Sequence, residues 1–363
     1  MKKLKAALIG CGRIGTKKHI EAYANNQDII ELVYCSDLDI NKAENATEQY
    51  FNQSGLKTNA IVGYDDLLDK ELDFVSIATE SGYHYQCTVD FLNAGKNVLV
   101  EKPMALSTEN ISEMIALAKE KNLKLGVCLQ NRFNQPIQEL KKKIDAGAFG
   151  KIFNVTARIL WNRNKGYYDL DSWRGTWELD GGTLMNQCAH NIDLLQWLLG
   201  GEVDSVYGVI RNFNHPYIKT EDFGTGILKF KNGTIGLLEG MANTYPNNLE
   251  ETISVFGEKG TVVIGGLAVN KILTWHFENE DSHPLMNSED PDTVYGSGHT
   301  TLFADYADAI INNRTPYITG ESGRIENEIV LGIYKSAIEN REIKFPLENV
   351  STDDFKDISL FEK

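Results

Sequence analysis

The sequence has few of the features that mark secreted, membrane-bound or metal-binding proteins. Its 363 residues include only five cysteines, which lie far apart and form no CxxC pair, so we expect neither a disulfide framework nor a zinc cluster. No stretch approaches the ~18 uninterrupted apolar residues that a membrane span requires. These absences favour a cytoplasmic protein without a metal site.

Positive charge is also scarce. Lys and Arg number 36 against 51 Asp and Glu, so the net charge of −15 disfavours binding to nucleic acid or to anionic membranes. The basic start of the chain is followed by a short apolar run that leads directly into glycines, without the cleavage site of a signal peptide. We therefore interpret this run as a first β-strand and expect a small-molecule partner.

The length and the hydrophobic pattern predict two domains. In residues 1–130, apolar β-branched runs alternate with amphipathic stretches, which is typical of an α/β Rossmann domain with a doubly wound parallel sheet. The expected strands are Leu4–Gly10, Ile30–Ser36, Phe74–Thr79, Asn97–Glu101 and Lys124–Leu129. The expected helices between them are Ile14–Asn25, Ile40–Phe51, Tyr83–Ala94 and Thr108–Lys121.

Residues 131–363 are expected to form an α+β domain for substrate binding and oligomerisation, with the last helices free to pack back on the first domain. Long alternating strands predict a large, mostly antiparallel and mostly sequential open sheet. These strands are Lys151–Arg163, Glu202–Asn212, Phe223–Phe230, Thr234–Met241, Glu251–Phe256 and Val269–Phe277. The expected helices are a strongly apolar one over Met185–Leu199, then Thr301–Asn312 and Gly323–Glu339.

The motif Gly10-Cys11-Gly12-Arg13-Ile14-Gly15 matches G-x-G-x-x-G directly after an apolar strand and at the start of a helix. The first glycine permits the tight turn, the second lets the backbone approach a pyrophosphate, and the third lets the helix pack closely on the strand. The helix start offers backbone N–H groups to the phosphates. A glycine-rich turn without a ligand is the alternative, but strand, helix and a following carboxylate together indicate a dinucleotide site.

That carboxylate is Asp37, which lies 22 positions after Gly15. In Rossmann folds, an acidic side chain about 20 residues after the glycine motif accepts hydrogen bonds from the ribose hydroxyls, and Asp37 is near that spacing. Asp37 would repel a 2′-phosphate, and the nearest basic residue after it is Lys42, so we expect NAD rather than NADP. Asp39 is interpreted as the N-cap of the next helix.

Glu101-Lys102-Pro103 stands at the carboxyl end of the expected strand Asn97–Glu101, where open α/β sheets place ligand-contacting residues. Pro103 restrains Lys102 to an extended conformation and removes a backbone donor, which suits an ammonium group aimed at a ligand. A surface lysine at a strand end fits the spacing equally well.

Asn186, His190 and Asp193 fall on one face of the expected apolar helix. A single histidine there is usually a core residue, but three polar side chains on one stripe favour a site. Histidine titrates near neutral pH, which suits a base that takes a hydroxyl proton. We expect Asp193 to orient His190 or the backbone rather than to react.

Together these motifs resemble the glucose–fructose oxidoreductase and inositol dehydrogenase (Gfo/Idh/MocA) family, over nearly the whole chain. The matching elements are the glycine loop, Glu101-Lys102-Pro103, and the helix in which Asp193 follows His190. The resemblance implies that Lys102 and His190 flank the reacting carbon and the nicotinamide; the Lys–Pro peptide is often cis in the family. The family commonly has an aspartate four residues before the histidine, where this chain has Asn186, and an amide cannot become anionic in a proton relay.

Two further stretches, residues 161–168 and 173–182, are similar to bacterial UDP-N-acetylglucosamine and UDP-N-acetylglucosaminuronate 3-dehydrogenases. Aromatic faces there suit sugar rings, and Arg163 or Arg174 suits a diphosphate or carboxylate through bidentate hydrogen bonds. Packing in a core is an equally ordinary role for these tryptophans and tyrosines.

Two stretches match the family less closely: the loop that contains Thr79 and His84, and Gln130-Asn131-Arg132-Phe133, which resembles the family's link into the substrate domain. In the family, the loop after the fourth strand lines the cofactor crevice, which implies this role for Thr79 and His84; helix capping or packing accounts for His84 as well. Residues 296–299, Gly-Ser-Gly-His, could close over substrate or simply lead into a helix.

The resemblance implies an NAD-dependent dehydrogenase acting on CH–OH groups, with C3–OH of a UDP-N-acetylhexosamine or its uronate as the oxidised alcohol. The alternatives are an inositol or free-monosaccharide dehydrogenase, and a non-catalytic dinucleotide-binding regulator. A homodimer or homotetramer is expected, because family members assemble through the open sheet face. The implied cofactor contacts are Gly10, Gly12, Arg13, Ile14, Gly15, Asp37, Thr79, His84, Glu101, Lys102 and Trp173. The implied substrate contacts are Lys102, Arg163, Tyr168, Arg174, Asn186 and His190, with Lys102 and His190 catalytic.

Overall fold

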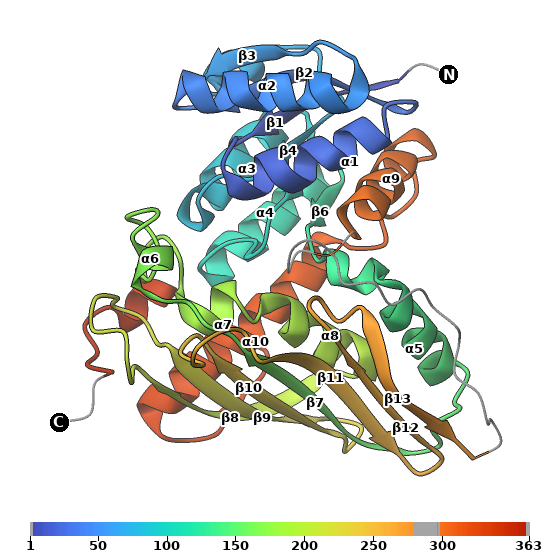
Figure 1. Cartoon of the computed structure of the whole chain (residues 1–363), viewed down its shortest axis with the longest axis vertical. Helices are drawn as coiled ribbons and strands as arrows, with labels where there is room; N and C mark the ends of the chain where they lie inside the picture. Colours follow the sequence, from blue (N-terminus) through green and yellow to red (C-terminus); the bar gives the residue numbers. More distant parts are fainter. Residues whose placement is uncertain (1–2, 279–295, 297, 361–363) are drawn as a thin grey trace. The chain divides into compact units, whose positions relative to one another are not determined.

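The computed structural model describes residues 3–278, 296 and 298–360 of the chain (Figure 1). These residues form two compact units, neither of which is continuous in sequence. The first comprises Met1–Ala105, Glu109–Gln130 and Ser297–Arg324, and the second comprises Leu106–Thr108, Asn131–Gly296 and Ile325–Lys363. Across the described ranges, no helix combines the length and the apolar character needed to cross a membrane.

The first unit contains a six-stranded parallel sheet in the order β3-β2-β1-β4-β5-β6. This is the strand order of a Rossmann fold, so the predicted fold class is confirmed. The strands are β1 (Leu4–Ile9), β2 (Ile30–Asp37), β3 (Asn59–Val62), β4 (Phe74–Ile77), β5 (Asn97–Val100) and β6 (Leu125–Val127). The edge strand β3 was not predicted, because its side chains are half-buried or exposed and it lacks the apolar run of the central strands.

Helices of the first unit follow the predicted positions with one local difference. They are α1 (Ile20–Asn25), α2 (Ile40–Ser54), α3 (His84–Asn93), α4 (Thr108–Glu120) and α9 (Gly298–Ile311), with short turns η2 (Asp65–Leu67) and η3 (Ser81–Tyr83). The helix predicted from residue 14 instead opens with a π-helical turn, η1 (Gly15–His19), before α1 begins. Asp39 caps α2, since its carboxylate accepts a hydrogen bond from the Asn41 amide (3.0 Å).

The late helix α9 packs against α1 in the first unit. Its Phe303 ring is fully buried and meets His19 and Tyr23 edge-on, at ring-centroid distances of 5.1 and 5.0 Å. The Tyr306 hydroxyl of α9 donates a hydrogen bond to the Lys124 carbonyl beside β6 (2.7 Å). A segment from the last fifth of the chain therefore contributes core residues to the N-terminal sheet.

The second unit contains an eight-stranded sheet in the order β13-β12-β11-β7-β10-β9-β8-β14. Its strands are β7 (Ile152–Leu160), β8 (Val203–Arg211), β9 (Phe223–Phe230), β10 (Ile235–Met241), β11 (Glu250–Gly257), β12 (Gly260–Gly265), β13 (Lys271–Phe277) and β14 (Ile343–Lys344). The mostly antiparallel sheet is confirmed, but its order is not simply sequential. Strand β7 lies between β11 and β10 and runs parallel to β10.

Helices lie along one face of this sheet (Figure 1). They are α5 (Gln135–Asp145), α7 (Gly182–Asn186), α8 (Ala189–Leu199) and α10 (Gly320–Glu339), while η4 (Gln130–Phe133), α6 (Lys165–Tyr168) and η5 (Thr352–Phe355) are short. On the same side, Trp177 is fully buried and meets the Tyr334 ring edge-on. This packing provides the main hydrophobic core of the unit.

The single helix predicted over Met185–Leu199 is wrong, because α7 ends at Asn186 and α8 begins at Ala189. The amides of Gln187 and Cys188 both bond to the Thr183 carbonyl, at 2.8 and 3.1 Å, so the backbone widens at this point. Regular helical bonding resumes from the Cys188 carbonyl. Asn186 and His190 therefore stand on separate helices rather than on one continuous face.

Candidate active site

The glycine loop of the first unit has the close approaches that its motif requires. A side chain on Gly10 would lie 2.6 Å from the backbone of Ala78 and Thr79, and Gly10 has a φ of +92°. A Cβ on Gly15 would lie 2.3 Å from the Gly10 carbonyl, whereas a Cβ on Gly12 would meet nothing within 4 Å. The loop thus packs tightly at its first and third glycines and leaves open space at the second, as a dinucleotide phosphate needs.

Asp37 closes β2 beside this loop. Its Oδ2 accepts a hydrogen bond from the Cys11 amide (2.8 Å), and its Oδ1 accepts one from the Asp39 amide (2.9 Å). The carboxylate therefore ties the glycine loop to the end of β2. A carboxylate fixed in this position suits the ribose of NAD, so the residues present fit the cofactor that the motif predicts.

His84 begins α3 and is buried among backbone carbonyls. Its Nδ1 lies 2.7 Å from the Pro103 carbonyl oxygen, and its Nε2 lies 3.1 Å from the Thr79 carbonyl oxygen. Burial lowers the pKa of His84, although both carbonyls favour its protonated form. The side chain thus joins the loop after β4 to the loop after β5, which sequence alone left undecided between packing and cofactor contact.

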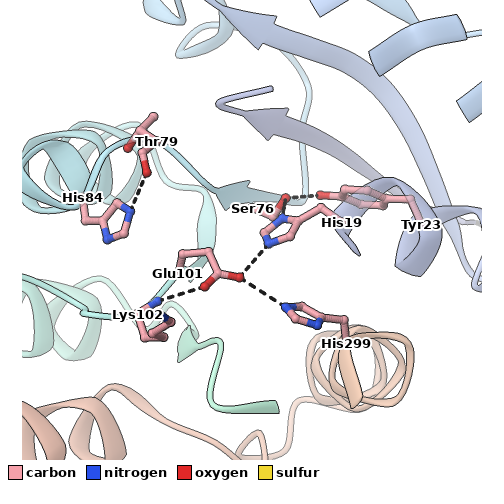
Figure 2. Close-up of polar contacts among 8 residues, drawn as sticks. All are labelled: His19, Tyr23, Ser76, Thr79, His84, Glu101, Lys102 and His299. Carbon is pink, nitrogen blue, oxygen red and sulfur yellow. Dashed lines mark hydrogen bonds and ion pairs between the residues drawn. The ribbon is translucent and has the colours of Figure 1, made fainter. Parts of the chain in front are cut away.

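Glu101, Lys102 and Pro103 follow β5, and the Lys102–Pro103 peptide bond is cis. Glu101 is buried, and its Oε1 lies 3.0 Å from His19 Nε2 and 3.3 Å from His299 Nε2 (Figure 2). The Lys102 amide donates to the other oxygen, Oε2, at 3.2 Å. Lys102 is itself half-buried.

Arg13 and Ile14 complete the motif, with Arg13 exposed and Ile14 half-buried. His299 is the second residue of α9. Ser297, which belongs to the predicted Gly-Ser-Gly-His loop, lies outside the described residues. Motifs and spacing did not place His19 or His299 near Glu101. A histidine four residues after the last motif glycine was the one available signal for His19.

His190 and Asn186 are the predicted polar residues of α8 and α7 in the second unit, and both are half-buried. The Asn186 amide donates a hydrogen bond to Oδ1 of Asp180, while Oδ2 of Asp180 accepts one from the Gly175 amide (2.6 Å). Asp180 is almost completely buried. A carboxylate thus lies one hydrogen bond away from Asn186, the position where the family commonly has an aspartate.

Asp193 forms a buried, bidentate ion pair with Arg132. Its Oδ2 lies 2.8 Å from Arg132 Nε, and its Oδ1 lies 2.5 Å from Arg132 Nη2. The Gln196 amide also donates to Oδ1 (3.2 Å). This paired geometry gives Asp193 a structural partner in η4, which the sequence had not identified.

Glu221 anchors the start of α7. Its Oε1 accepts hydrogen bonds from the Leu184 amide (2.7 Å) and the Tyr334 hydroxyl (2.8 Å). A Cβ on Gly182 would lie 1.9 Å from Oε2, so only glycine fits there. Burial raises the pKa of Glu221 to about 8, despite these two hydrogen bonds.

Two arginines of the second unit stack on aromatic rings, and Tyr167 lies against both. The Arg163 guanidinium lies 4.5 Å from the Trp161 ring centroid and 5.3 Å from that of Tyr167. The Arg174 guanidinium lies 4.6 Å from the ring centroids of both Tyr167 and Trp173 and donates to the Tyr167 hydroxyl (2.7 Å). We call these five residues the arginine–aromatic cluster.

Tyr168, the remaining predicted substrate contact, is buried behind this cluster. Its ring packs against those of Tyr167 and His215, at centroid distances of 5.1 and 5.5 Å. Tyr167, not Tyr168, is the tyrosine that bonds to Arg174 and also receives a hydrogen bond from the Gln187 amide (3.1 Å). Adjacent tyrosines could not be distinguished from the sequence.

Comparisons with known proteins agree with the two-unit architecture. Residues 4–129 match the model of an oxidoreductase family with an NAD-binding Rossmann fold, and residues 137–263 match that of a GFO/IDH/MocA C-terminal domain. A crystal structure of the WlbA dehydrogenase from Bordetella pertussis, in complex with NADH and UDP-GlcNAcA, is 35% identical with a TM-score of 0.83. That match covers 96% of this chain and 99% of the other.

Two curated relatives are named for other substrates. The D-glucoside 3-dehydrogenase of Escherichia coli strain K12 is 25% identical, with 92% of this chain and 95% of that protein covered. The NAD(+)-dependent scyllo-inositol 2-dehydrogenase of Bacillus subtilis strain 168 is 24% identical, with 90% and 92% covered. The similarity therefore extends over whole chains in each case.

We expect Asp37→Ala to raise the KM for NAD about 10- to 100-fold. The ratio of kcat/KM with NAD to kcat/KM with NADP should fall as well. The reason is the loss of a charged hydrogen-bond acceptor, worth ~1.5–3 kcal/mol, and of the repulsion toward a 2′-phosphate. Steady-state kinetics with both coenzymes measure this change. Asp39→Ala is the matched control, because it removes only the cap of α2; an unchanged NAD-to-NADP ratio in Asp37→Ala would contradict the assignment.

Proposed function

Because the chain belongs to the Gfo/Idh/MocA family of oxidoreductases, NAD-dependent dehydrogenases acting on CH–OH groups, we propose that it oxidises a nucleotide sugar. The proposed reacting group is the C3–OH of a UDP-N-acetylhexosamine or of its uronate. The observation that carries this proposal is the whole-length match to WlbA, whose crystal structure contains NADH and UDP-GlcNAcA, at 35% identity. The two curated relatives, named for a D-glucoside and for scyllo-inositol, are less similar, at 25% and 24% identity.

The proposed reaction converts a secondary alcohol to a ketone. NAD⁺ supplies the hydride acceptor when bound. His190 accepts the hydroxyl proton, and the Lys102 ammonium group stabilises the negative charge that develops on the oxygen. Gly12 lets the phosphates of the cofactor approach the backbone, and the Asp37 carboxylate accepts hydrogen bonds from the ribose hydroxyls.

The arginine–aromatic cluster supports an anionic substrate. A chain with a net charge of −15 repels a nucleotide sugar unless cations are concentrated where it binds. Arg163 and Arg174 supply such cations. Their guanidinium groups lie over the rings of Trp161, Tyr167 and Trp173, and that of Arg174 is also held by Asp171 (Nε–Oδ2, 3.0 Å). Planar guanidinium groups can hold a diphosphate or a carboxylate with two parallel hydrogen bonds.

The substrate proposal is tested by mixing the protein with NAD⁺ and one alcohol of a panel at a time. The absorbance of the reduced nicotinamide measures the reaction. UDP-N-acetylglucosamine, its uronate, myo-inositol, scyllo-inositol and glucose distinguish the alternatives. We expect NAD⁺ to be reduced only when a UDP-sugar is present. Reduction with an inositol or glucose alone would move the enzyme to the second candidate, which the B. subtilis relative favours. Where NADH stays bound, an added 2-oxoacid accepts its hydride and regenerates NAD⁺, so turnover is then measured as loss of the alcohol rather than by absorbance. No loss of any alcohol under these conditions would favour a dinucleotide-binding regulator.

We expect Lys102→Ala and His190→Ala each to lower kcat by about 10²- to 10⁴-fold. Groups that stabilise a developing charge, as proposed for Lys102, or that transfer a proton, as proposed for His190, contribute on this scale. Steady-state turnover at saturating alcohol and NAD⁺ gives kcat, and stopped-flow measurement of a single turnover gives the rate constant of hydride transfer. Far-UV circular dichroism and the thermal unfolding midpoint serve as the controls for correct folding, because Lys102 is also an implied cofactor contact. Near wild-type turnover in both variants would refute the assigned roles.

The exposed face of the large sheet supports assembly of identical chains. Tyr207 on β8, Ile227 on β9 and Leu237 on β10 lie opposite one another in register, and each is more than a third exposed. Phe153 on β7 and Leu273 on β13 add exposed apolar area to the strands of this sheet. Exposed apolar side chains in such a row are typical of a protein interface, and we propose a second copy of this chain as the partner.

We expect wild-type protein to sediment as a dimer or tetramer and Ile227→Lys to sediment as a smaller species. The reason is that an unpaired ammonium group at the middle of a buried apolar row costs several kcal/mol. Analytical ultracentrifugation measures the change. The exposed Ile311→Lys in the first unit is the control; equal masses for wild type and Ile227→Lys would exclude this face as the interface.

A further inference from the structure

We propose that three buried histidines, His19, His84 and His299, are positioning residues that hold the backbone on both sides of Lys102. The inference rests on the proposed function, in which Lys102 stabilises the charge on the alcohol oxygen. None of the three histidines is assigned a part in the reaction itself. All of the contacts that support the inference lie within the first unit.

On one side of Lys102, the carboxylate of Glu101 is held by two imidazoles. His19 Nε2 and His299 Nε2 both meet Oε1, and the Lys102 amide donates to Oε2 (Figure 2). Burial by itself would raise the pKa of Glu101, but the hydrogen bonds from His19 and His299 hold that pKa well below its usual range. The carboxylate is therefore an anion that fixes the peptide bond leading into Lys102.

A chain of donors fixes the orientation of His19. The Tyr23 hydroxyl donates to Ser76 Oγ (2.8 Å), and Ser76 Oγ lies 3.0 Å from His19 Nδ1. With the Ser76 hydroxyl donating to Nδ1, the ring proton of a neutral His19 is on Nε2 and faces Glu101. His19 also ends the π-helical turn η1, a departure from regular helix that is frequent at functional sites.

On the other side of Lys102, His84 holds the Pro103 carbonyl. Both nitrogens of His84 face carbonyl oxygens, and Pro103 is the nearer acceptor at 2.7 Å. Because burial lowers the pKa of His84, the ring is neutral near pH 7 and has one proton to donate. The shorter distance places that proton on Nδ1, toward Pro103.

A metal site is the other chemistry that these residues suggest. One nitrogen of His19, one nitrogen of His299 and one oxygen of Glu101 lie within 4.8 Å of one another. However, the two nitrogens are at direct hydrogen-bond distances from Oε1, and Oε2 already accepts the Lys102 amide. The geometry therefore points to a hydrogen-bonded anion, and metal content is measured in the test.

The effect on catalysis follows from the precision that transition-state contacts require. Displacing a reacting group by about 1 Å can cost on the order of 100-fold in rate. We expect His299→Leu to lower kcat about 10- to 100-fold, with the dissociation constant of NAD⁺ within about 3-fold of wild type. His299→Gln keeps a donor near the position of Nε2, so most of the activity should return.

The pH profile separates positioning from a general loss of stability. Losing a hydrogen-bond donor to Glu101 raises the pKa of that carboxylate, because burial is then less opposed. In His299→Leu, activity should therefore fall at a higher pH on the acid side than in wild type. The titratable groups that face Glu101 or its histidines are Lys18, His19, His84, Lys102, Cys128 and His299.

The deciding measurement is hydrogen exchange of the backbone around Lys102, which needs no substrate. Peptides covering residues 97–106 are followed by mass spectrometry in wild type, His299→Leu, His299→Gln, His84→Leu and His84→Asn. We expect at least about 10-fold faster exchange in both leucine variants and less than about 3-fold in the two amide variants. Asp305→Asn is the control, since Asp305 lies on the same helix as His299 but bonds to Arg314 and to the Tyr317 amide rather than to Glu101 or to residues 97–106.

The outcomes separate this inference from the proposed function. Unchanged exchange in the leucine variants, or a stoichiometric divalent ion that depends on His19 and His299, would overturn it whatever the substrate. Faster exchange with no alcohol oxidised by wild type would support positioning and reject the proposed reaction. If His299→Leu does not fold, the His84 pair provides the same comparison on the other side of Lys102.

Discussion

A buried anion, the carboxylate of Glu101, is the constraint on which the organisation of the first unit depends. An ionised group inside a protein is tolerated only when donors replace its water. Here the two imidazole donors come from residues 82 and 198 positions away in sequence, on η1 and α9. The sheet, the π-helical turn and the late helix must therefore assemble together before this charge is satisfied, and the residue after it, Lys102, inherits their rigidity.

Buried carboxyl groups in the second unit are stabilised differently from Glu101 in the first. Glu221 is kept neutral near pH 7, because burial raises its pKa to about 8, and it accepts hydrogen bonds at the start of α7. Asp193 stays paired with Arg132 in a bidentate contact. Asp180 receives the Asn186 amide and the Gly175 amide. Each acid thus anchors a loop or helix end near the residues that the sequence singled out for chemistry.

Local patterns in the sequence were enough for the parallel sheet, apart from its edge strand β3, and for the glycine loop. The glycine spacing, the apolar runs and Asp37 each depend on neighbours within about 20 residues, and the structure agrees with them. Contacts between distant segments left no such signal: His299 meets Glu101 only because α9 returns to the first sheet. The break between α7 and α8 was also missed, because the apolar period continues through Gln187 and Cys188 while the backbone widens.

The return of α9 has a consequence for synthesis of the chain. When residue 130 leaves the ribosome, every strand of the first sheet exists, but Phe303 and His299 do not. The nascent sheet therefore lacks one wall of its core and one donor to its buried charge until some 170 further residues have been made. The order of translation thus differs from the order in which this unit can reach its final form, and residues 131–296 of the second unit are synthesised within that interval.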